Sequence, residues 1–127
     1  MAVIGVGMDL VEVDRAALLL EHHGDRALQR FLLPAERAYV KTMAHPARHF
    51  AVRLAAKEAA YKALSRLRGA TAIGWRDIEV ARDRRGRPSI LFHGKANEVA
   101  SGAGRYRISV SLTHTALTAG AVVLIEV

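Results

Sequence analysis

The sequence predicts an α+β fold in which a mostly antiparallel sheet packs around one long central helix. Three observations carry this prediction. A helical pattern rich in alanine and leucine runs from Arg48 to Leu67. Alternating apolar residues mark strands before and after it, and a glycine-containing turn joins two of these strands as a hairpin. Because the chain runs from a strand to a group of helices and then to further strands, an α+β arrangement is favoured over a parallel α/β sheet.

One domain covering residues 1–127 is expected from the length and composition. Hydrophobic residues make up 51% of the chain, which is enough for a core and too much for a largely disordered protein. Cysteine is absent, so disulfide bonds, zinc–thiolate sites and thiol chemistry are excluded. The first residues lack the features of a signal peptide, and no apolar run reaches the roughly 20 residues that span a bilayer. We therefore expect a cytoplasmic protein with no membrane partner.

The chain carries a formal net charge of +7, which is large for its size. Such an excess indicates an acidic partner, and it says little about the fold. Nucleic acid, an acidic protein surface or a polyphosphate ligand would each suit it. Aromatic residues are sparse, and none stands in the stacking motif of an RNA-binding sheet. Composition therefore leaves nucleic acid open as a partner beside an acidic protein and a polyphosphate, but the sequence contains no nucleic-acid-binding motif.

The N-terminal residues alternate in a way that predicts a strand over Ala2–Val13. One face of this strand carries Gly5, Gly7 and Asp9 in succession, and glycines within a strand often mark the close approach of another backbone or a ligand. Asp9 is either part of such a site or an ordinary polar residue near a strand end. Three helices are predicted next: Arg15–His23 capped by Asp14, Arg26–Phe31 capped by Asp25, and Ala35–Met43 after Pro34.

The central helix, Arg48–Leu67, begins around Pro46 and carries a cluster of charges beside its apolar stripe. The cluster consists of Arg53, Lys57, Glu58 and Lys62. One carboxylate among several cations on a rigid helix is typical of a seat for a metal ion and an anionic ligand. The alternative is a solvated face on which Glu58 and Lys62 form an i,i+4 pair worth roughly 0.3–0.5 kcal/mol. Taken by itself, the helix favours this alternative.

The second half of the chain is predicted to be mainly strands. A strand over Trp75–Arg82 leads through the turn Asp83–Pro88 into a returning strand over Ser89–His93. The pattern then predicts a short helix over Gly94–Gly102 and two strands, of which the first is Arg105–His114 and the second, Ala119–Val127, is apolar enough to be buried on both faces.

Several of these stretches, in order along the chain, carry a resemblance to one family. They are Gly5–Val13, Phe31–Tyr39, Phe50–Leu64, Trp75–Val80, Gly86–Pro88 and Ser111–Thr115. Together they resemble the holo-acyl-carrier-protein synthases, which are small 4'-phosphopantetheinyl transferases, and the resemblance implies their 4'-phosphopantetheinyl transferase-like fold. The chain departs from the family pattern at Ser65, where a glycine is usual, and in the content of the 69–74 loop. We expect Ser65 to lengthen the helix or to alter a backbone contact to the phosphates.

The resemblance implies transfer of 4'-phosphopantetheine from coenzyme A to a serine hydroxyl of an apo acyl carrier protein, with release of 3',5'-ADP, in fatty acid or polyketide biosynthesis. Asp9 and Glu58 would hold Mg²⁺, and Glu58 and Lys62 would be catalytic, with Lys62 reaching the pyrophosphate. The base that removes the serine proton is left open between Glu58 and a metal-bound water. The residues implied to contact coenzyme A are Arg53, Lys57, Lys62, Gly86, Arg87, Pro88, His114 and Thr115.

The family also implies a homotrimer with coenzyme A in clefts between subunits, where Gly86–Pro88 and His114–Thr115 would come from a neighbour. Arg15 and Arg26 would dock the acidic carrier protein, so the resemblance implies a protein partner and no nucleic acid. Two alternatives stand beside these expectations. The strand periodicity places His114 on an apolar face, which suits a packed core histidine. The chain as a whole could also be a binding module whose basic surface docks acidic proteins or nucleic acid without chemistry.

Overall fold

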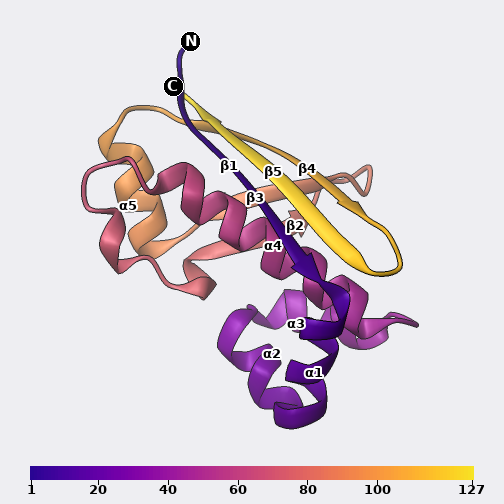
Figure 1. The fold of residues 1–127 in the computed structure, drawn as a ribbon. Coiled ribbons are helices and arrows are strands. Elements are labelled where there is room, and N and C mark those ends of the chain that lie inside the picture. The colour runs from indigo at the N-terminus through magenta and orange to yellow at the C-terminus, as the bar shows by residue number, and fades with distance from the viewer.

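Helix α4 (Pro46–Leu64) runs through the middle of the molecule, with a sheet on one side and smaller helices at its ends (Figure 1). The computed structural model describes all residues 1–127 and confirms the α+β class. The remaining helices are α1 (Val13–His23), α2 (Asp25–Phe31), α3 (Pro34–Thr42) and α5 (Gly94–Gly102). The strands are β1 (Val3–Glu12), β2 (Ile78–Arg82), β3 (Pro88–Phe92), β4 (Arg107–His114) and β5 (Thr118–Glu126).

The strands form two antiparallel sheets. The larger sheet has the order β1-β5-β4, so the last strand of the chain lies between the first strand and the strand before it. The smaller sheet is the predicted hairpin of β2 and β3. Both termini lie together at one end of the β1–β5 pair (Figure 1), because Ala2 and Val127 exchange backbone hydrogen bonds of 2.8 and 2.9 Å. The larger sheet therefore closes the chain on itself and covers one side of α4.

Helix α4 is buried on almost every side in its middle, where each residue from Phe50 to Lys57 is buried. The sequence predicted a single apolar stripe with a charged face beside it. Alanines explain the difference, because their small side chains let strands and helices approach α4 from several directions without leaving cavities. Tyr61, which the pattern placed in the stripe, is 41% exposed.

Two glycines bring β1 directly onto α4. A Cβ atom at Gly7 would lie 1.9 Å from the carbonyl oxygen of Ala59, and one at Gly5 would lie 2.0 Å from the carbonyl oxygen of Ala63. Both neighbours are backbone atoms of a helix, which cannot move aside as a flexible side chain can. The predicted close approach of another backbone at these glycines is therefore confirmed, and it places the rest of this strand face, including Asp9, over α4.

Replacing Gly7 by alanine should lower the free energy of unfolding by about 1–3 kcal/mol or more, since overpacking forces backbone shifts of that cost. The strand would have to move away from α4 by more than an ångström to relieve the contact with Ala59. Urea denaturation checks this, with Gly102→Ala as the control because a Cβ at Gly102 meets nothing within 4 Å. Equal midpoints for the two variants would contradict the close packing.

Some predicted boundaries and caps were wrong. Helix α1 begins at Val13 without a side-chain cap, so Asp14 lies in its first turn. Helix α2 includes Asp25, and its capping position is Gly24, with φ of 55°. Residues 75–77 form a 3₁₀ turn, held by a 2.9 Å hydrogen bond from the Gly74 N–H to Asp77 Oδ2, and the strand starts only at Ile78. Ser65 does not lengthen the central helix, which ends at Leu64, three residues earlier than predicted.

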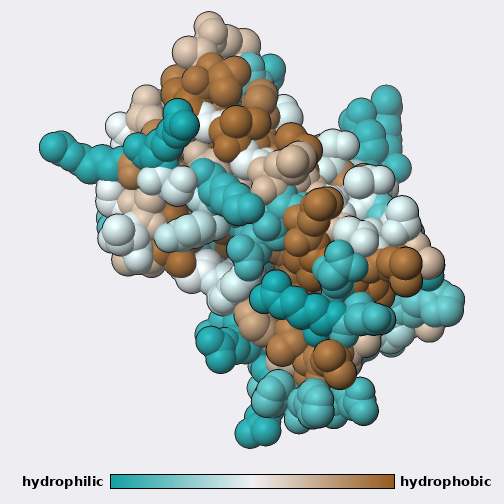
Figure 2. Space-filling view, viewed as in Figure 1, coloured by the Kyte–Doolittle hydropathy of each residue, from teal (hydrophilic) through white to brown (hydrophobic).

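Strand β5 is buried on one face only, which corrects the prediction of burial on both. Its inner face packs against α4, whereas Val122 on the outer face is 40% exposed. The neighbouring strand β1 adds Val6, Met8 and Leu10 to the same outer face, each at least 61% exposed. Hydrophobic atoms follow the diagonal course of β1 and β5 across the surface in Figure 2. We call Val6, Met8, Leu10 and Val122 the outer sheet face. None of the helices combines the length and hydropathy needed to cross a membrane.

Candidate active site

Asp9 and Lys62 meet where β1 passes over the C-terminal half of α4. Lys62 Nζ donates to Asp9 Oδ1 and to the Met8 carbonyl oxygen, at 3.0 Å in each case. The side chain of Asp9 is 16% exposed and that of Lys62 is 52% exposed, so the carboxylate is mostly covered while the ammonium reaches solvent. The packing of Gly7 on the helix allows this contact between residues that are 53 positions apart.

Glu58 precedes Lys62 by one helical turn and therefore lies on the same side of α4. It is half-buried and takes part in none of the ion pairs of the chain. The predicted alternative of a surface pair between Glu58 and Lys62 is wrong, because Lys62 turns to Asp9. We call Asp9, Glu58 and Lys62 the Asp9 cluster.

A cavity of about 260 Å³ opens beside Glu58. Most of its wall is apolar, and Glu58 and Lys57 are the charged residues in it. The lining residues are Lys57, Glu58, Tyr61, Ile73, Gly74, Trp75 and Ile78. Three lining residues were not among the predicted site residues. Tyr61 follows Glu58 by about one helical turn, and Ile73 and Trp75 lie in the segment after the helix. An apolar cavity with one free carboxylate suits a mostly uncharged chain attached to a reacting phosphate.

Lys57 is buried in a network of its own and is only 1% exposed. Its ammonium donates to Glu36 Oε1 at 2.8 Å, to the Trp75 carbonyl oxygen at 3.0 Å and to the Ile78 carbonyl oxygen. Burial lowers the pKa of Lys57, and the Glu36 carboxylate opposes that shift. All three ammonium hydrogens are used within the fold. Contact between Lys57 and a phosphate, which the resemblance implies, would require one of these bonds to break.

Glu36 is the partner that sequence reasoning missed. The sequence placed it only in the first turn of a helix, yet it is 2% exposed and connects three elements. Besides the bond from Lys57, its carboxylate accepts the N–H of Leu33, the residue before α3, at 2.7 Å and the N–H of Val80 on β2 at 3.0 Å. Glu36 and Lys57 thus fix the segment from Trp75 to Ile78 as one wall of the cavity beside Glu58.

Arg53 lines a second, separate cavity of about 200 Å³. Its guanidinium carbon lies 4.4 Å from the centre of the Tyr39 ring, and that of Arg82 lies 4.8 Å from the same ring. Burial lowers the pKa of Arg53, although the Glu36 carboxylate opposes the shift. No carboxylate lines this cavity, whose charged or titratable lining residues are His49, Arg53, Arg82 and His114. We call these four residues the basic cavity.

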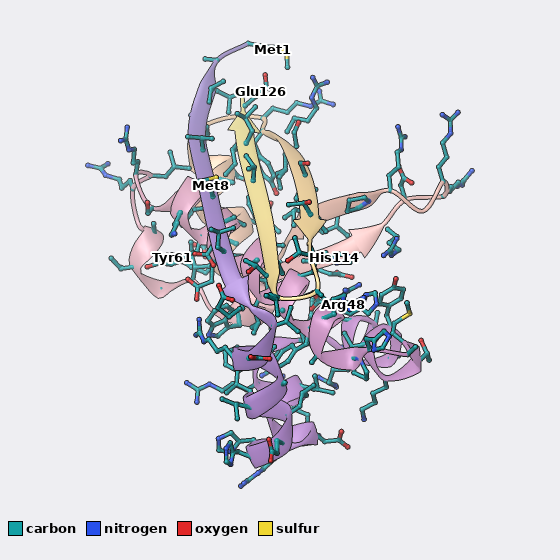
Figure 3. All side chains as sticks on the ribbon, turned by 45° about the vertical axis from the view of Figure 1, so that its right-hand side comes forward. Met1, Met8, Arg48, Tyr61, His114 and Glu126 are labelled. Carbon is teal, nitrogen blue, oxygen red and sulfur yellow. The ribbon has the colours of Figure 1, made fainter.

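His114 is exposed at the end of β4, so the predicted alternative of a packed core histidine is wrong. Figure 3 shows Tyr61 and His114 on opposite sides of the β1–β5 pair. The Asp9 cluster and the basic cavity are therefore separate groups within one chain. Pro88, another predicted coenzyme contact, lines the basic cavity and not the cavity beside Glu58.

The remaining predicted contacts lie in turns. Gly86 has φ of 79° at the tip of the hairpin, and Arg87 Nε donates to Asp83 Oδ2 at 2.9 Å, which ties the turn together. Thr115 Oγ accepts the Thr118 N–H at 3.0 Å in the turn between β4 and β5. These residues are exposed and are placed on the side of the basic cavity by the strands that they connect.

The two arginines predicted to dock a carrier protein lie on the helices after β1. Arg15 is exposed on α1, and Arg26 is exposed on α2. Neither forms an ion pair within the chain, so both charges are available to a partner.

Comparison with known proteins is consistent across sequence and structure. The model of the 4'-phosphopantetheinyl transferase superfamily matches residues 5–111. The holo-[acyl-carrier-protein] synthase of Koribacter versatilis is 45% identical over 98% of both chains. The crystal structure of the synthase from Neisseria meningitidis superposes with a TM-score of 0.82 at 27% identity, over 98% of this chain and 99% of that one. The crystal structure of the Bacillus anthracis synthase in complex with CoA (3',5'-ADP) superposes with a TM-score of 0.77 at 28% identity, over 98% of this chain and 96% of that one. The chain belongs to the 4'-phosphopantetheinyl transferase superfamily, and within it to the holo-[acyl-carrier-protein] synthases.

Proposed function

We propose that this protein transfers 4'-phosphopantetheine from coenzyme A to a serine hydroxyl of an apo acyl carrier protein in a Mg²⁺-dependent reaction. In the transfer, a bond forms between the serine oxygen and the phosphorus next to pantetheine, the pyrophosphate bond breaks, and 3',5'-ADP leaves. The observation that carries the proposal is the meeting of Asp9 and Lys62 at 3.0 Å beside the unpaired Glu58. The ammonium of Lys62 could bind the pyrophosphate of coenzyme A. The carboxylates of Asp9 and Glu58 could hold a cation that neutralises the charge developing on the oxygen of the leaving 3',5'-ADP.

The donor set of the Asp9 cluster fits Mg²⁺. This ion prefers oxygen ligands and is normally held by one or two carboxylates, substrate phosphates and waters, so no third protein ligand is needed. Asp9 already accepts a cationic nitrogen at Oδ1, and the carboxylate of Glu58 is free of ion pairs. Asp9 and Glu58 would hold the ion, which when bound would supply positive charge to the pyrophosphate oxygens.

Other side chains of this site would bind the phosphate, accept the serine proton and hold the pantetheine arm. Lys62 is half exposed and can turn from Asp9 to a phosphate oxygen, where a lysine acts as a compact positive charge. Glu58 is the carboxylate within the cavity that is free to accept the serine proton. The apolar wall of that cavity would hold the pantetheine arm away from water, and Glu36 with Lys57 would keep the wall in place.

We further propose that the active form is a homotrimer with coenzyme A bound between subunits. The cavity beside Glu58 and the basic cavity share no lining residue, and Tyr61 and His114 lie to either side of the β1–β5 pair (Figure 3). A coenzyme molecule bound between two copies would contact the Asp9 cluster of one copy and the basic cavity of the other. The outer sheet face supports association, because apolar patches of this kind mark interaction surfaces. Gly86, Arg87 and Thr115 would then reach the coenzyme from the neighbouring subunit.

Replacing Val122 by aspartate should dissociate this assembly. The variant places a charge in the outer sheet face, and burial of a charge at such a position should weaken association by about 2 kcal/mol or more per interface, roughly thirtyfold. Size-exclusion chromatography with light scattering checks the mass. Leu91→Asp is the matched control, because Leu91 is 47% exposed on β3, outside the larger sheet. A wild-type monomer, or an unchanged mass for the Val122 variant, would contradict the assembly.

The assay that tests the function mixes the protein with coenzyme A, Mg²⁺ and an apo acyl carrier protein. The expected result is a mass increase of one phosphopantetheine on the carrier, with stoichiometric 3',5'-ADP, and the loss of both when the metal is chelated. The acidic carrier should dock on Arg15 and Arg26, so the rate at low carrier concentration should fall as salt is added. Tight binding of the carrier without any 3',5'-ADP would favour the binding module. Parallel assays with fatty-acid and polyketide carriers would identify the acceptor.

A further inference from the structure

Lys62 is the one cation of the Asp9 cluster, and its side chain can move. Its Nζ atom lies 3.0 Å from Asp9 Oδ1 and 3.0 Å from the Met8 carbonyl oxygen, so two oxygen atoms of β1 hold one positive charge. The side chain of Lys62 is 52% exposed, whereas that of Asp9 is 16% exposed. The lysine can therefore swing into solvent, while the carboxylate stays where β1 places it.

The carboxylate that binds Lys62 is also one of the two that we assign to Mg²⁺. An ammonium and a divalent ion on one carboxylate repel each other even when they contact different oxygen atoms, because like charges so close together are poorly screened. Lys62 pairs with Asp9 and not with Glu58, which forms no ion pair although it lies one helical turn away. The contact between Asp9 and Lys62 should therefore lower the affinity of the cluster for a metal ion that arrives without coenzyme A.

The pyrophosphate of coenzyme A would give Lys62 a different partner. A lysine is a compact charge on a flexible stem, so its ammonium can exchange one anion for another without a change in the backbone. Once Lys62 contacts a phosphate oxygen, the carboxylates of Asp9 and Glu58 are both free of ammonium groups. Coenzyme A would then favour metal binding in two ways, since it draws Lys62 away from Asp9 and adds phosphate oxygens as ligands. Such coupling is reciprocal, so the metal would favour coenzyme binding by the same factor.

We infer that Lys62 competes with the metal ion for Asp9 until coenzyme A binds, and that it thereby makes metal binding depend on the coenzyme. The inference rests on the proposed function, from which it takes both the metal and the pyrophosphate. It gives Lys62 a role in the free chain in addition to its role beside the phosphate. Free metal ions would bind weakly, and the loaded site would form mainly when coenzyme A is present.

Binding of Mn²⁺ measures this competition without any transfer reaction. Mn²⁺ takes the same oxygen ligands as Mg²⁺, and electron paramagnetic resonance counts the ions that remain free in solution. Lys62→Met should bind Mn²⁺ alone about three- to tenfold more tightly than the wild type, because the competing charge is removed. With saturating coenzyme A, and after correction for Mn²⁺ bound by coenzyme A alone, the two affinities should agree within about twofold.

Two further variants separate the charge of Lys62 from other effects. Lys62→Arg keeps a cation beside Asp9, so it should keep the low affinity of the wild type for Mn²⁺ alone. Lys41→Met is the matched control, because Lys41 forms an exposed pair with Asp25 at 3.1 Å and does not contact Asp9. Its affinity for Mn²⁺ should equal that of the wild type.

An affinity of Lys62→Met for Mn²⁺ alone that is equal to or below that of the wild type would overturn the inference. An advantage of Lys62→Met that persists unchanged with coenzyme A would also overturn it, because Lys62 would then oppose the metal without leaving Asp9. Both results leave the proposed function intact. A wild-type protein that binds no Mn²⁺ even with coenzyme A would instead contradict the metal site of the proposed function, and the inference with it.

Discussion

Replacing Glu58 by glutamine is expected to lower kcat of phosphopantetheine transfer by about a thousandfold or more while the fold is kept. The change removes a carboxylate that faces the cavity and that we assign both to the metal and to the serine proton. Charge stabilisation of this kind is worth several kcal/mol in the transition state, and each 1.36 kcal/mol is tenfold in rate. The size of the side chain is unchanged and no ion pair is broken, so the melting temperature should stay within a few degrees of wild type.

Single-turnover transfer, followed by mass spectrometry of the carrier, measures the Glu58 variant at saturating coenzyme A. Glu98→Gln is the matched control, because Glu98 is an exposed carboxylate on α5, away from both cavities. Asp9→Asn should lose activity to a similar degree, although it also breaks the contact with Lys62. That contact is partly exposed and is worth about 1 kcal/mol or less for stability. Full activity in both the Glu58 and the Asp9 variants would refute the assignment of the site.

The central helix and the hairpin could be predicted because their signals are local. A helical pattern with few β-branched residues and a glycine turn between alternating segments each specify an element without knowledge of the rest of the chain. The glycines of β1 were also informative, because glycines within a strand often mark the close approach of another backbone or a ligand, and a helix backbone does lie against them. The strand pattern alone left the role of Asp9 open, and the resemblance to a family assigned it to the site.

The roles of the charges on α4 could not be predicted from their spacing. Lys57 and Lys62 occur on the same helix in similar surroundings, yet one is buried against Glu36 and the other reaches solvent. The difference depends on a partner 21 residues away and on strands that arrive from the second half of the chain. The basic cavity was not predicted for a related reason, since Arg82 and His114 come from two separate strands and meet His49 and Arg53 only in the folded chain.

The apolar sequence of β5 was interpreted as burial on both faces within one chain, and this interpretation was wrong. Val122 is apolar on a face that is exposed in a single chain, so the pattern of a fully buried strand does not reflect the fold of one subunit. Burial by another copy of the chain, as in the proposed trimer, would account for the same pattern. An apolar pattern in a sequence therefore does not distinguish burial within one subunit from burial between subunits.

Replacing Lys57 by methionine should lower the free energy of unfolding by about 3–5 kcal/mol, because it leaves the Glu36 carboxylate buried without its counter-ion. This is a large part of the roughly 5–15 kcal/mol that stabilises a domain. Urea denaturation at fixed protein concentration measures it. Lys41→Met is the control, since Lys41 forms an exposed pair with Asp25 and should change stability by less than about 1 kcal/mol.

The double variant Lys57→Met, Glu36→Gln distinguishes an uncompensated charge from lost packing. Glutamine at position 36 keeps an acceptor for the N–H of Leu33 or Val80 and removes the charge that Lys57→Met leaves unpaired. The double variant should therefore be more stable than Lys57→Met alone, with a coupling energy of about 1–3 kcal/mol between the two sites. Simple additivity would mean that the pair contributes through shape and not through charge. Glu36 and Lys57 would then position the cavity wall as packed side chains, and the buried ion pair would not be what holds Trp75 and Ile78 beside Glu58.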